Sequence, residues 1–289
     1  MSAPCVLVPR RSWPGHRFPA WAVAALRAAG AHVVDHEGAR PRRWDATLLP
    51  AVLPAGAPPA RGRTGQVIAL LDAPPRPGDG LLRGADVVAT SAALAAAWEG
   101  EEDARVVRPA VLPGTAAADA GPVLRVASVA PLHWSGGHEH AVAAVAALIR
   151  DGTRAELCVA GDGPARESVL FTAFDLGIER AVSIAGGSER EAVQAADAVV
   201  VAAVEDRAWT GLLHAFACTV PAVASDLPTA RELDGAQLVP PRDPAALAAA
   251  LSALAGDPGL RAGLAARGRR AAVTDVEACG RALLETVAR

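Results

Sequence analysis

The order of the apolar runs constrains the fold more than any other feature of this sequence. Short runs rich in β-branched residues, such as Cys5–Pro9 and Ala155–Ala160, alternate with longer runs rich in alanine and leucine, such as Pro19–Ala29 and His138–Arg150. The short runs favour strands, and the longer ones carry apolar residues at helical spacing. Strands that alternate with helices predict an α/β fold, in which a parallel sheet is covered on both faces.

This alternation runs through the chain twice. The stretch Pro109–Gly121, rich in proline, glycine and alanine, separates the two cycles and is interpreted as a linker. We therefore predict two doubly wound, Rossmann-like lobes, residues 1–113 and residues 114–273, whose ligands lie at the carboxyl ends of the strands in a cleft between the lobes. The expected strands are Cys5–Pro9, Ala31–Asp35, Asp45–Leu49, Gln66–Leu71, Ala85–Thr90, Arg105–Arg108, Leu124–Val129, Ala155–Ala160, Val182–Ile184, Ala198–Ala202, Ala222–Ala224 and Gln237–Val239.

Composition excludes several classes of protein. The 289 residues are 52% hydrophobic and carry a formal net charge of −3. Such a chain is too apolar to be disordered, and it has no global basic field to attract nucleic acid or an anionic membrane. No apolar run approaches the length of about 18 residues that a membrane span requires. All the basic residues are arginines, so no site in this chain can use a lysine ammonium.

The cysteines indicate a reducing compartment. Cys5, Cys158, Cys218 and Cys279 are far apart in the sequence, and most of them lie in apolar runs. We interpret them as buried thiols of a cytoplasmic protein, in preference to a disulfide pair or a metal site.

Glycine-rich turns follow two strands of the second lobe. Gly161-Asp162-Gly163-Pro164 comes directly after Ala155–Ala160, and Ser135-Gly136-Gly137 precedes the helix at His138. Glycine lets a backbone approach a ligand, and a helix N-terminus offers free N–H groups to an anion. A tight turn that simply needs small residues explains the first motif equally well.

Two further segments could carry chemistry. The stretch Leu132–His140 holds three histidines and Glu139, but His138 and His140 point to different faces of a helix, and no metal-binding motif supports a zinc site. The stretch Glu205–Gly211 places acids, Arg207, Trp209 and small residues at the end of a strand. An ordinary solvated loop is the alternative interpretation of that second stretch.

Residues 124–272 resemble the retaining glycosyltransferases of family 4, which adopt the GT-B fold of two Rossmann-like lobes. The matching stretches occur in the family's order: LHWSGGHEHAV, CVAGDGP, DLGIERAVSIAGG, AADAVVVAAVED, LLHAFACTVPAVASDLPTARE, LVPPRDPAALAAAL and DPGLRAGLAARGR. The first lobe resembles the family only through ADVVATSAALAAAW and VVRPAVLPG, and it is shorter than usual. The resemblance implies that the C-terminal helix of this chain, at about 274–289, packs back on the first lobe.

The resemblance implies that a nucleotide-sugar donor is held by the second lobe and that the sugar passes to an acceptor held by the first lobe, with no metal or cofactor. It assigns Arg10, Arg11 and Asp72 to the acceptor side. It assigns catalysis to Asp206, Arg207 and His214, and donor binding to Ser135, Gly136, Gly137, Gly161, Asp162, Gly163, Ala185, Gly186, Trp209, Thr210 and Gly211.

The sequence departs from the family at the donor site. The family's arginine and lysine fall at Pro131 and Gly136, and its two glutamates fall at Asp206 and His214. The usual cations for the leaving diphosphate are therefore absent, and each such loss typically costs about 10²–10³ in rate. We hypothesise that Arg207, Arg10 and Arg11 replace them, because guanidinium groups pair bidentately with phosphate oxygens.

Three functions remain open from the sequence. The first is an active glycosyltransferase for a small-molecule acceptor, with a rearranged donor site. The second is a catalytically degraded relative that acts as a binding module or as the partner of an active enzyme. The third is a GT-B relative with different chemistry, such as epimerisation or coupling of a non-sugar nucleophile, in which the histidines are candidate acid–base groups.

Overall fold

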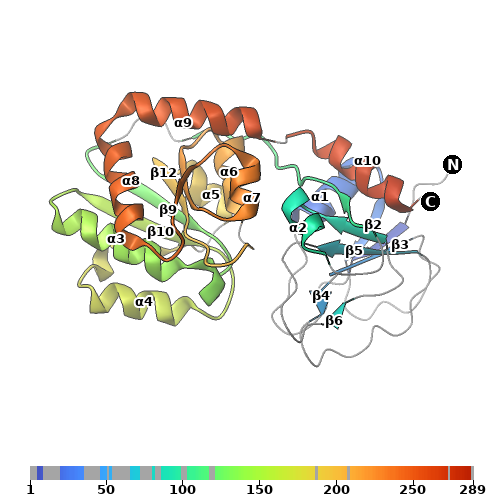
Figure 1. Ribbon diagram of the computed structural model, residues 1–289, viewed down its shortest axis with the longest axis horizontal. Helices are drawn as coiled ribbons and strands as arrows, with labels where there is room; N and C mark the ends of the chain where they lie inside the picture. Colours follow the sequence, from blue (N-terminus) through green and yellow to red (C-terminus); the bar gives the residue numbers. More distant parts are fainter. Residues whose placement is uncertain are drawn as a thin grey trace. The chain divides into compact units, whose positions relative to one another are not determined.

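The computed structural model describes residues 5–8, 20–35, 46–50, 52–53, 66–71, 80–81, 86–98, 103–116, 121–185, 188–206, 209–272 and 274–287. The chain divides into two compact units (Figure 1). Unit 1 comprises Met1–Leu112 and Val273–Arg289, and unit 2 comprises Pro113–Ala272. These boundaries lie one residue from those expected from the sequence, and each unit is described by itself below.

Unit 2 is a six-stranded parallel sheet with the strand order β11-β10-β9-β12-β13-β14. This order is the 3-2-1-4-5-6 order of a Rossmann fold, so the chain reverses direction across the sheet between β9 and β12. The strands are β9 (Leu124–Val129), β10 (Ala155–Ala160), β11 (Val182–Ile184), β12 (Ala198–Val201), β13 (Ala222–Ser225) and β14 (Gln237–Val239).

The helices of unit 2 connect these strands and cover the sheet (Figure 1). The central strands are buried on both faces, which explains why they are nearly continuous runs of valine and alanine. The helices are α3 (His138–Arg150), α4 (Arg166–Asp175), α5 (Glu189–Gln194), α6 (Thr210–Ala217), α7 (Pro228–Leu233), α8 (Pro244–Gly256) and α9 (Pro258–Ala271), with 3₁₀ turns η1 (Trp134–Gly136) and η2 (Glu179–Ala181).

Unit 1 holds a second parallel sheet, whose described strands have the order β2-β1-β3-β5-β7-β8. This is the 2-1-3-4-5 order of flavodoxin-like folds with one more strand, so its reversal point lies between β1 and β3. The strands are β1 (Cys5–Val8), β2 (His32–Asp35), β3 (Ala46–Pro50), β5 (Gln66–Leu71), β7 (Asp86–Ala89) and β8 (Arg105–Val106), with α1 (Ala20–Ala28), α2 (Ala92–Ala96) and a small pair, β4 (Val52–Leu53) and β6 (Gly80–Leu81).

The C-terminal helix α10 (Val276–Val287) belongs to unit 1, although its sequence follows unit 2. Cys279 and Leu283 of α10 share a hydrophobic core with Ala25 and Leu26 of α1. The two helices approach so closely that a Cβ atom on Gly280 would lie 1.9 Å from the carbonyl oxygen of Ala25. The C-terminus is thereby fixed on the first unit, as the resemblance implied.

The expected linker requires a correction. Ala110 and Val111, which open the stretch read as a linker, are buried in unit 1 with exposed fractions of 2% and 6%. Arg108 also accepts a hydrogen bond from the thiol of Cys279 through its carbonyl oxygen, 3.4 Å away. Proline and alanine in this stretch suggested an exposed connection, but its apolar side chains complete a core.

Helix α7 was not expected from the sequence, because it is one and a half turns long and lies within a stretch read only as a family motif. Cys158 is half-buried, in contrast to the buried position expected for it, whereas Cys218 and Cys279 are buried, and all three are free thiols. Within the described residues no helix is both long enough and apolar enough to cross a membrane.

Candidate functional site

Three loops meet at the carboxyl end of β9. The loop after β9 bonds to the loop after β10, because the amide of Leu132 donates to the carbonyl of Asp162 at 2.9 Å. It also bonds to the loop after β12, where the amide of Val204 donates to the carbonyl of Ser135 at 2.9 Å. This point is the reversal point of the sheet, where ligands of doubly wound folds bind.

The glycines of these loops allow the three backbones to touch. A Cβ atom on Gly137 would lie 1.9 Å from the carbonyl oxygen of Ala202, and one on Gly161 would lie 1.9 Å from that of Ala130. A Cβ atom on Gly163 would lie 2.2 Å from the carbonyl oxygen of Leu132, and one on Gly211 would lie 2.5 Å from that of Val129. The fold itself therefore requires these glycines, whether or not a ligand also uses the space above them.

The helix that follows each of these three loops begins without a side-chain cap. The N-cap residues of α3, α4 and α6 are Gly137, Ala165 and Trp209, and none of them accepts a hydrogen bond through its side chain. In contrast, α5, α8 and α9 are capped by Ser188, Asp243 and Asp257.

An uncapped helix N-terminus leaves backbone N–H groups for another acceptor and carries a partial positive charge. Three such termini offer backbone N–H groups and partial positive charge to an anion, whereas an aspartate cap there would repel a negatively charged ligand. This device needs no lysine and no arginine.

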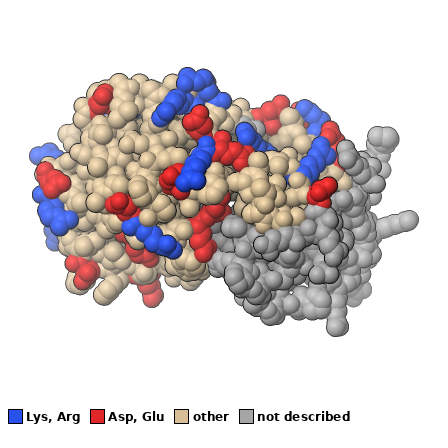
Figure 2. Space-filling model, in the orientation of Figure 1, with Lys and Arg blue, Asp and Glu red and all other residues tan. Residues whose placement is uncertain are grey.

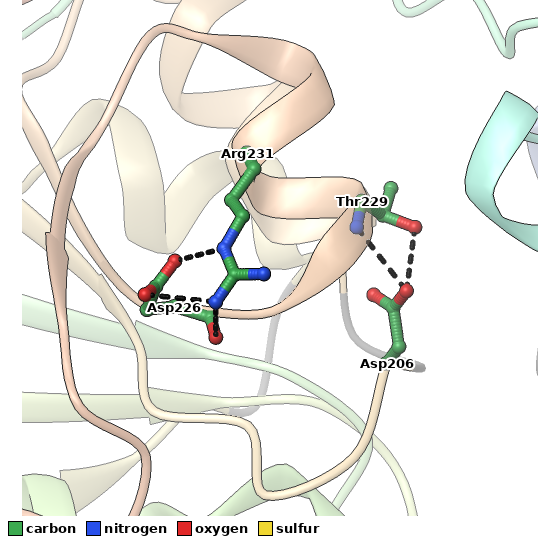
Figure 3. Close-up of polar contacts among 4 residues, drawn as sticks. All are labelled: Asp206, Asp226, Thr229 and Arg231. Carbon is green, nitrogen blue, oxygen red and sulfur yellow. Dashed lines mark hydrogen bonds and ion pairs between the residues drawn. The ribbon is translucent and has the colours of Figure 1, made fainter.

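Asp206, at the end of the loop after β12, caps a neighbouring helix (Figure 3). Its Oδ2 atom accepts hydrogen bonds from the backbone N–H of Thr229 at 3.2 Å and from the hydroxyl of Thr229 at 2.8 Å. Helix α7 needs this partner because its own N-cap is Leu227 and its first residue is Pro228. Burial raises the pKa of Asp206, and the two hydrogen bonds from Thr229 oppose that rise.

A second carboxylate near α7, that of Asp226, forms an ion pair with an arginine of the same helix. Arg231 of α7 donates through Nε to Oδ1 of Asp226 at 2.5 Å and through Nη2 to Oδ2 at 3.0 Å (Figure 3). This contact lowers the pKa of Asp226. The pair attaches α7 to the loop after β13. Because the guanidinium of Arg231 is paired with Asp226, it does not replace the cations that the family places at the diphosphate.

Removing the carboxylate of Asp206 is expected to destabilise the protein. Thr229 is fully buried, and Asp206→Ala removes the carboxylate oxygen that accepts from both its N–H and its hydroxyl. The loss of these hydrogen bonds at a helix N-terminus costs about 1–2 kcal/mol. Urea unfolding should show a loss of about 2 kcal/mol, with less than about 1 kcal/mol for Asp206→Asn, which keeps an acceptor oxygen. Equal stability of wild type and Asp206→Ala would refute this capping role.

A buried histidine at the start of α3 holds the loop after β9 through hydrogen bonds. His138 is fully buried, with Nδ1 2.8 Å from the hydroxyl of Ser128 and Nε2 3.1 Å from the carbonyl oxygen of Ala130. Because a carbonyl can only accept, Nε2 donates to Ala130, and in a neutral ring Nδ1 then accepts from the hydroxyl of Ser128. Burial lowers the pKa of His138. This histidine is a core residue and cannot exchange protons with a substrate.

The protein is expected to lose stability as the pH falls through about 6.5. The folded state keeps His138 neutral, whereas the unfolded chain protonates it near the ordinary value of 6.5, so acidification favours unfolding. The contribution is present above that pH and is lost below it, at up to about 1.4 kcal/mol per pH unit. Urea unfolding of wild type and His138→Gln from pH 7.5 to 5.0 measures it; identical pH slopes would contradict the assignment.

His214 lies on α6 and faces α5 rather than α7. Its Nε2 atom is 3.9 Å from Oε2 of Glu189, and its Nδ1 atom is buried with no hydrogen-bond partner among the described residues. Burial lowers the pKa of His214, with a smaller effect from Arg190, and burial raises the pKa of Glu189. Such an orphaned nitrogen is a place where a ligand hydroxyl could bind.

The structure brings together most of the residues expected at the donor site. Glycines 136, 137, 161, 163 and 211 meet around β9, and Trp209 and Asp206 line a small apolar pocket next to α7. Ala185 follows β11 and donates its amide to Val159 at 2.8 Å. Five of the expected site residues lie outside the described part of the chain: Arg10, Arg11, Asp72, Gly186 and Arg207.

Sequence reasoning missed three contributors. Thr229 holds Asp206, Glu189 faces His214, and Trp134 of η1 is half exposed, with its ring 5.6 Å from that of His133. A half-exposed tryptophan in a ligand-binding loop is a signal that could have been used. The other two could not be found from the sequence, because their partners lie more than twenty residues away.

Residues 123–257 match the model of the family described as glycosyl transferases group 1. The matched residues lie within unit 2. A stretch of 130 residues is 34% identical to the exopolysaccharide phosphotransferase of Streptomyces coelicolor. That stretch covers 42% of this chain but only 14% of the relative.

Solved structures resemble the chain over nearly its whole length. Sucrose-phosphate synthase from Thermosynechococcus elongatus covers 98% of both chains with a TM-score of 0.73 and 17% identity. HepE of Anabaena, solved with UDP and glucose, covers 99% of this chain and 100% of its own, with a TM-score of 0.76 and 14% identity. These likenesses show that the fold is GT-B.

Proposed function

We propose that the chain is a glycosyltransferase that moves a sugar from a nucleoside-diphosphate sugar to a small-molecule acceptor. The observation that carries this proposal is the set of three uncapped helices, α3, α4 and α6, at the reversal point of a group 1 domain. On the visible face of unit 2 arginines and acidic residues are interspersed, so this face carries no basic patch that would bind an anion (Figure 2).

In the proposed reaction the bond between the anomeric carbon and the diphosphate breaks, and an acceptor hydroxyl forms a bond to that carbon while its proton passes to an oxygen of the leaving diphosphate. Negative charge then develops on the leaving diphosphate. N–H groups at the starts of α3 and α6 would stabilise this charge in the place that the family gives to its cations, and Arg207 would add a guanidinium. We propose that the reaction proceeds with retention and requires neither a metal nor a cofactor, as the resemblance to family 4 implies.

Two side chains would hold the sugar and the ribose. Thr229 engages Oδ2 of Asp206, which leaves Oδ1 to accept from a sugar hydroxyl. His214 presents an unpartnered Nδ1 that could bond to a ribose hydroxyl. Ala185 and Gly186, after β11, would lie beside the nucleoside.

We propose UDP-glucose as the first donor to test, because HepE was solved with UDP and glucose. The acceptor would contact unit 1 through Arg10, Arg11 and Asp72. The free thiols of Cys158, Cys218 and Cys279 support a reducing compartment, and we propose the cytoplasm.

A second candidate function is a binding domain that recognises a sugar nucleotide without transferring the sugar. Its support is the replacement of the family's cations, together with the likeness to part of an enzyme named for phosphotransfer rather than for glycosyl transfer. Such a domain would keep the anion site and lose turnover.

Thermal unfolding in the presence of UDP, GDP, dTDP and their glucose conjugates tests the proposed site. A ligand at about 100 times its Kd stabilises the folded state by roughly 2.7 kcal/mol. We expect one base to raise the Tm, and an Arg207→Ala variant to bind the corresponding diphosphate several-fold more weakly in calorimetry. The absence of any shift across the panel would overturn both candidate functions.

A further inference from the structure

Helix α4 carries an apolar surface that unit 2 does not use for its own core. Its inner side buries Val169 and Ala173, whereas Phe171 and Phe174 are each 69% exposed. Leu170 is 40% exposed, and Leu176, which directly follows the helix, is 42% exposed. We call these four residues, Leu170, Phe171, Phe174 and Leu176, the α4 patch. Two of the chain's four phenylalanines therefore lie in water on a single helix.

We propose that the α4 patch is a dimer interface, in which α4 of one copy packs antiparallel against α4 of a second copy. The helix covers the β10–β11 edge of the unit 2 sheet and packs against α3 and β11 with its inner side (Figure 1). Its outer side is exposed from Arg166 to Asp175, except at the half-buried Thr172 and the buried inner residues. The geometry thus leaves one long side of this helix available.

The area of the patch matches what a two-fold dimer requires. With a phenylalanine burying roughly 200 Å², the four side chains expose about 400 Å² of apolar surface. In a two-fold dimer each copy contributes the same patch, so the apolar area buried by the two copies together is twice this value. Because about 60% of an interface is apolar, the total would be about 1,300 Å², at the lower end of specific interfaces. Isologous pairing is the arrangement that makes a patch of this size sufficient.

The charges around the patch favour a second copy over an anionic membrane. Arg166, Glu167, Asp175, Glu179 and Arg180 surround it with both signs and a net charge of −1. An anionic surface would instead be expected to attract a basic rim. In the part of the chain that the structure describes, these five side chains form no ion pair, so they are available to a partner.

The ends of the helix favour the antiparallel arrangement. Arg166 and Glu167 lie in the first turn of α4 and Asp175 in the last, so the dipole of their own helix disfavours Arg166 and Asp175 and favours Glu167. Beside an antiparallel partner Arg166 and Asp175 lie next to the end of the other helix that favours them, which outweighs the one charge, Glu167, that is disfavoured there. A parallel arrangement would place like ends together.

Sedimentation equilibrium of the whole 289-residue chain tests the proposal. We expect the wild type to be in a monomer–dimer equilibrium with a micromolar Kd, and Phe171→Ser/Phe174→Ser to be at least tenfold weaker with an unchanged Tm. Leu260→Ser is the matched control, because Leu260 is 39% exposed on another helix, α9. It should leave the Kd unchanged.

Two results would overturn the proposal. The first is a wild type that is monomeric at about 100 µM, or a double variant that dimerises like the wild type. The second is binding of a monomeric wild type to neutral phosphatidylcholine vesicles, lost in the double variant, which would assign the α4 patch to a membrane surface. Neither result bears on nucleotide binding, so this test is independent of the proposed function.

Discussion

Gly137→Ala is expected to lower the free energy of unfolding by about 2–5 kcal/mol, a large effect for a single methyl group. Gly137 has a φ of +67°, and the added Cβ would lie 1.9 Å from the carbonyl oxygen of Ala202. The backbone conformation alone costs a non-glycine residue about 1–2 kcal/mol, and the contact adds overpacking of about 1–3 kcal/mol. Urea unfolding followed by circular dichroism measures the difference.

Gly177→Ala is the matched control for this change. Gly177 has a φ of +70°, nearly the same conformation, but nothing lies within 4 Å of its added Cβ. It should therefore cost only the conformational part, about 1–2 kcal/mol. If the two variants were equally stable, the close approach between the loops after β9 and β12 would not exist, and the site would have to be rebuilt.

Thr210→Asp is expected to weaken nucleoside-diphosphate binding about 10- to 100-fold without destabilising the fold. Thr210 is the first residue of α6, where a carboxylate is favoured by the helix dipole by about 0.3–1 kcal/mol. A phosphate about 6 Å away would be repelled by about 3 kcal/mol at an effective dielectric constant of about 20. Calorimetry gives the affinity, and urea unfolding gives the stability.

Thr210→Asn is the control, because asparagine has nearly the same shape as aspartate and no charge. It should bind the nucleotide within about threefold of wild type, a change of less than 1 kcal/mol. Stability that rises in the aspartate variant while affinity falls would show that the free N–H groups of α6 serve a ligand. An aspartate variant that binds as tightly as the asparagine variant would place the phosphates elsewhere.

The architecture of unit 2 could be predicted from local pattern because its central strands are largely buried. Buried parallel strands must be continuous apolar runs, so Leu124–Val129 and Ala155–Ala160 have the observed bounds. The glycine turns at Gly137 and Gly161 were predicted as ligand-binding loops, with a tight turn that needs small residues as an equal alternative at Gly161, and the structure supports the need for small residues at both. Each glycine also faces the backbone of a neighbouring loop, a partner that is set by topology.

The rest of the site depends on contacts between distant segments. Asp206 resembles a catalytic carboxylate in the sequence, and only the folded chain shows that it caps α7 through Thr229, which lies 23 positions further along the chain. The same limit applies to Ala110, which suggested a linker in the sequence but shares a hydrophobic core with Cys279 and Leu283 of α10 in the folded chain. Residue type indicates what a group can do, and its partner decides which of those things it does.

The release of nucleoside diphosphate from the donor that raises the Tm tests the central claim most directly. The chain is incubated with that donor and candidate acceptors, and the diphosphate is quantified by anion-exchange chromatography. The account predicts diphosphate that accumulates in proportion to the protein and falls with Thr210→Asp but not with Thr210→Asn. A donor that binds and yet stays intact with every acceptor, and in water, would contradict glycosyl transfer and leave only a binding domain.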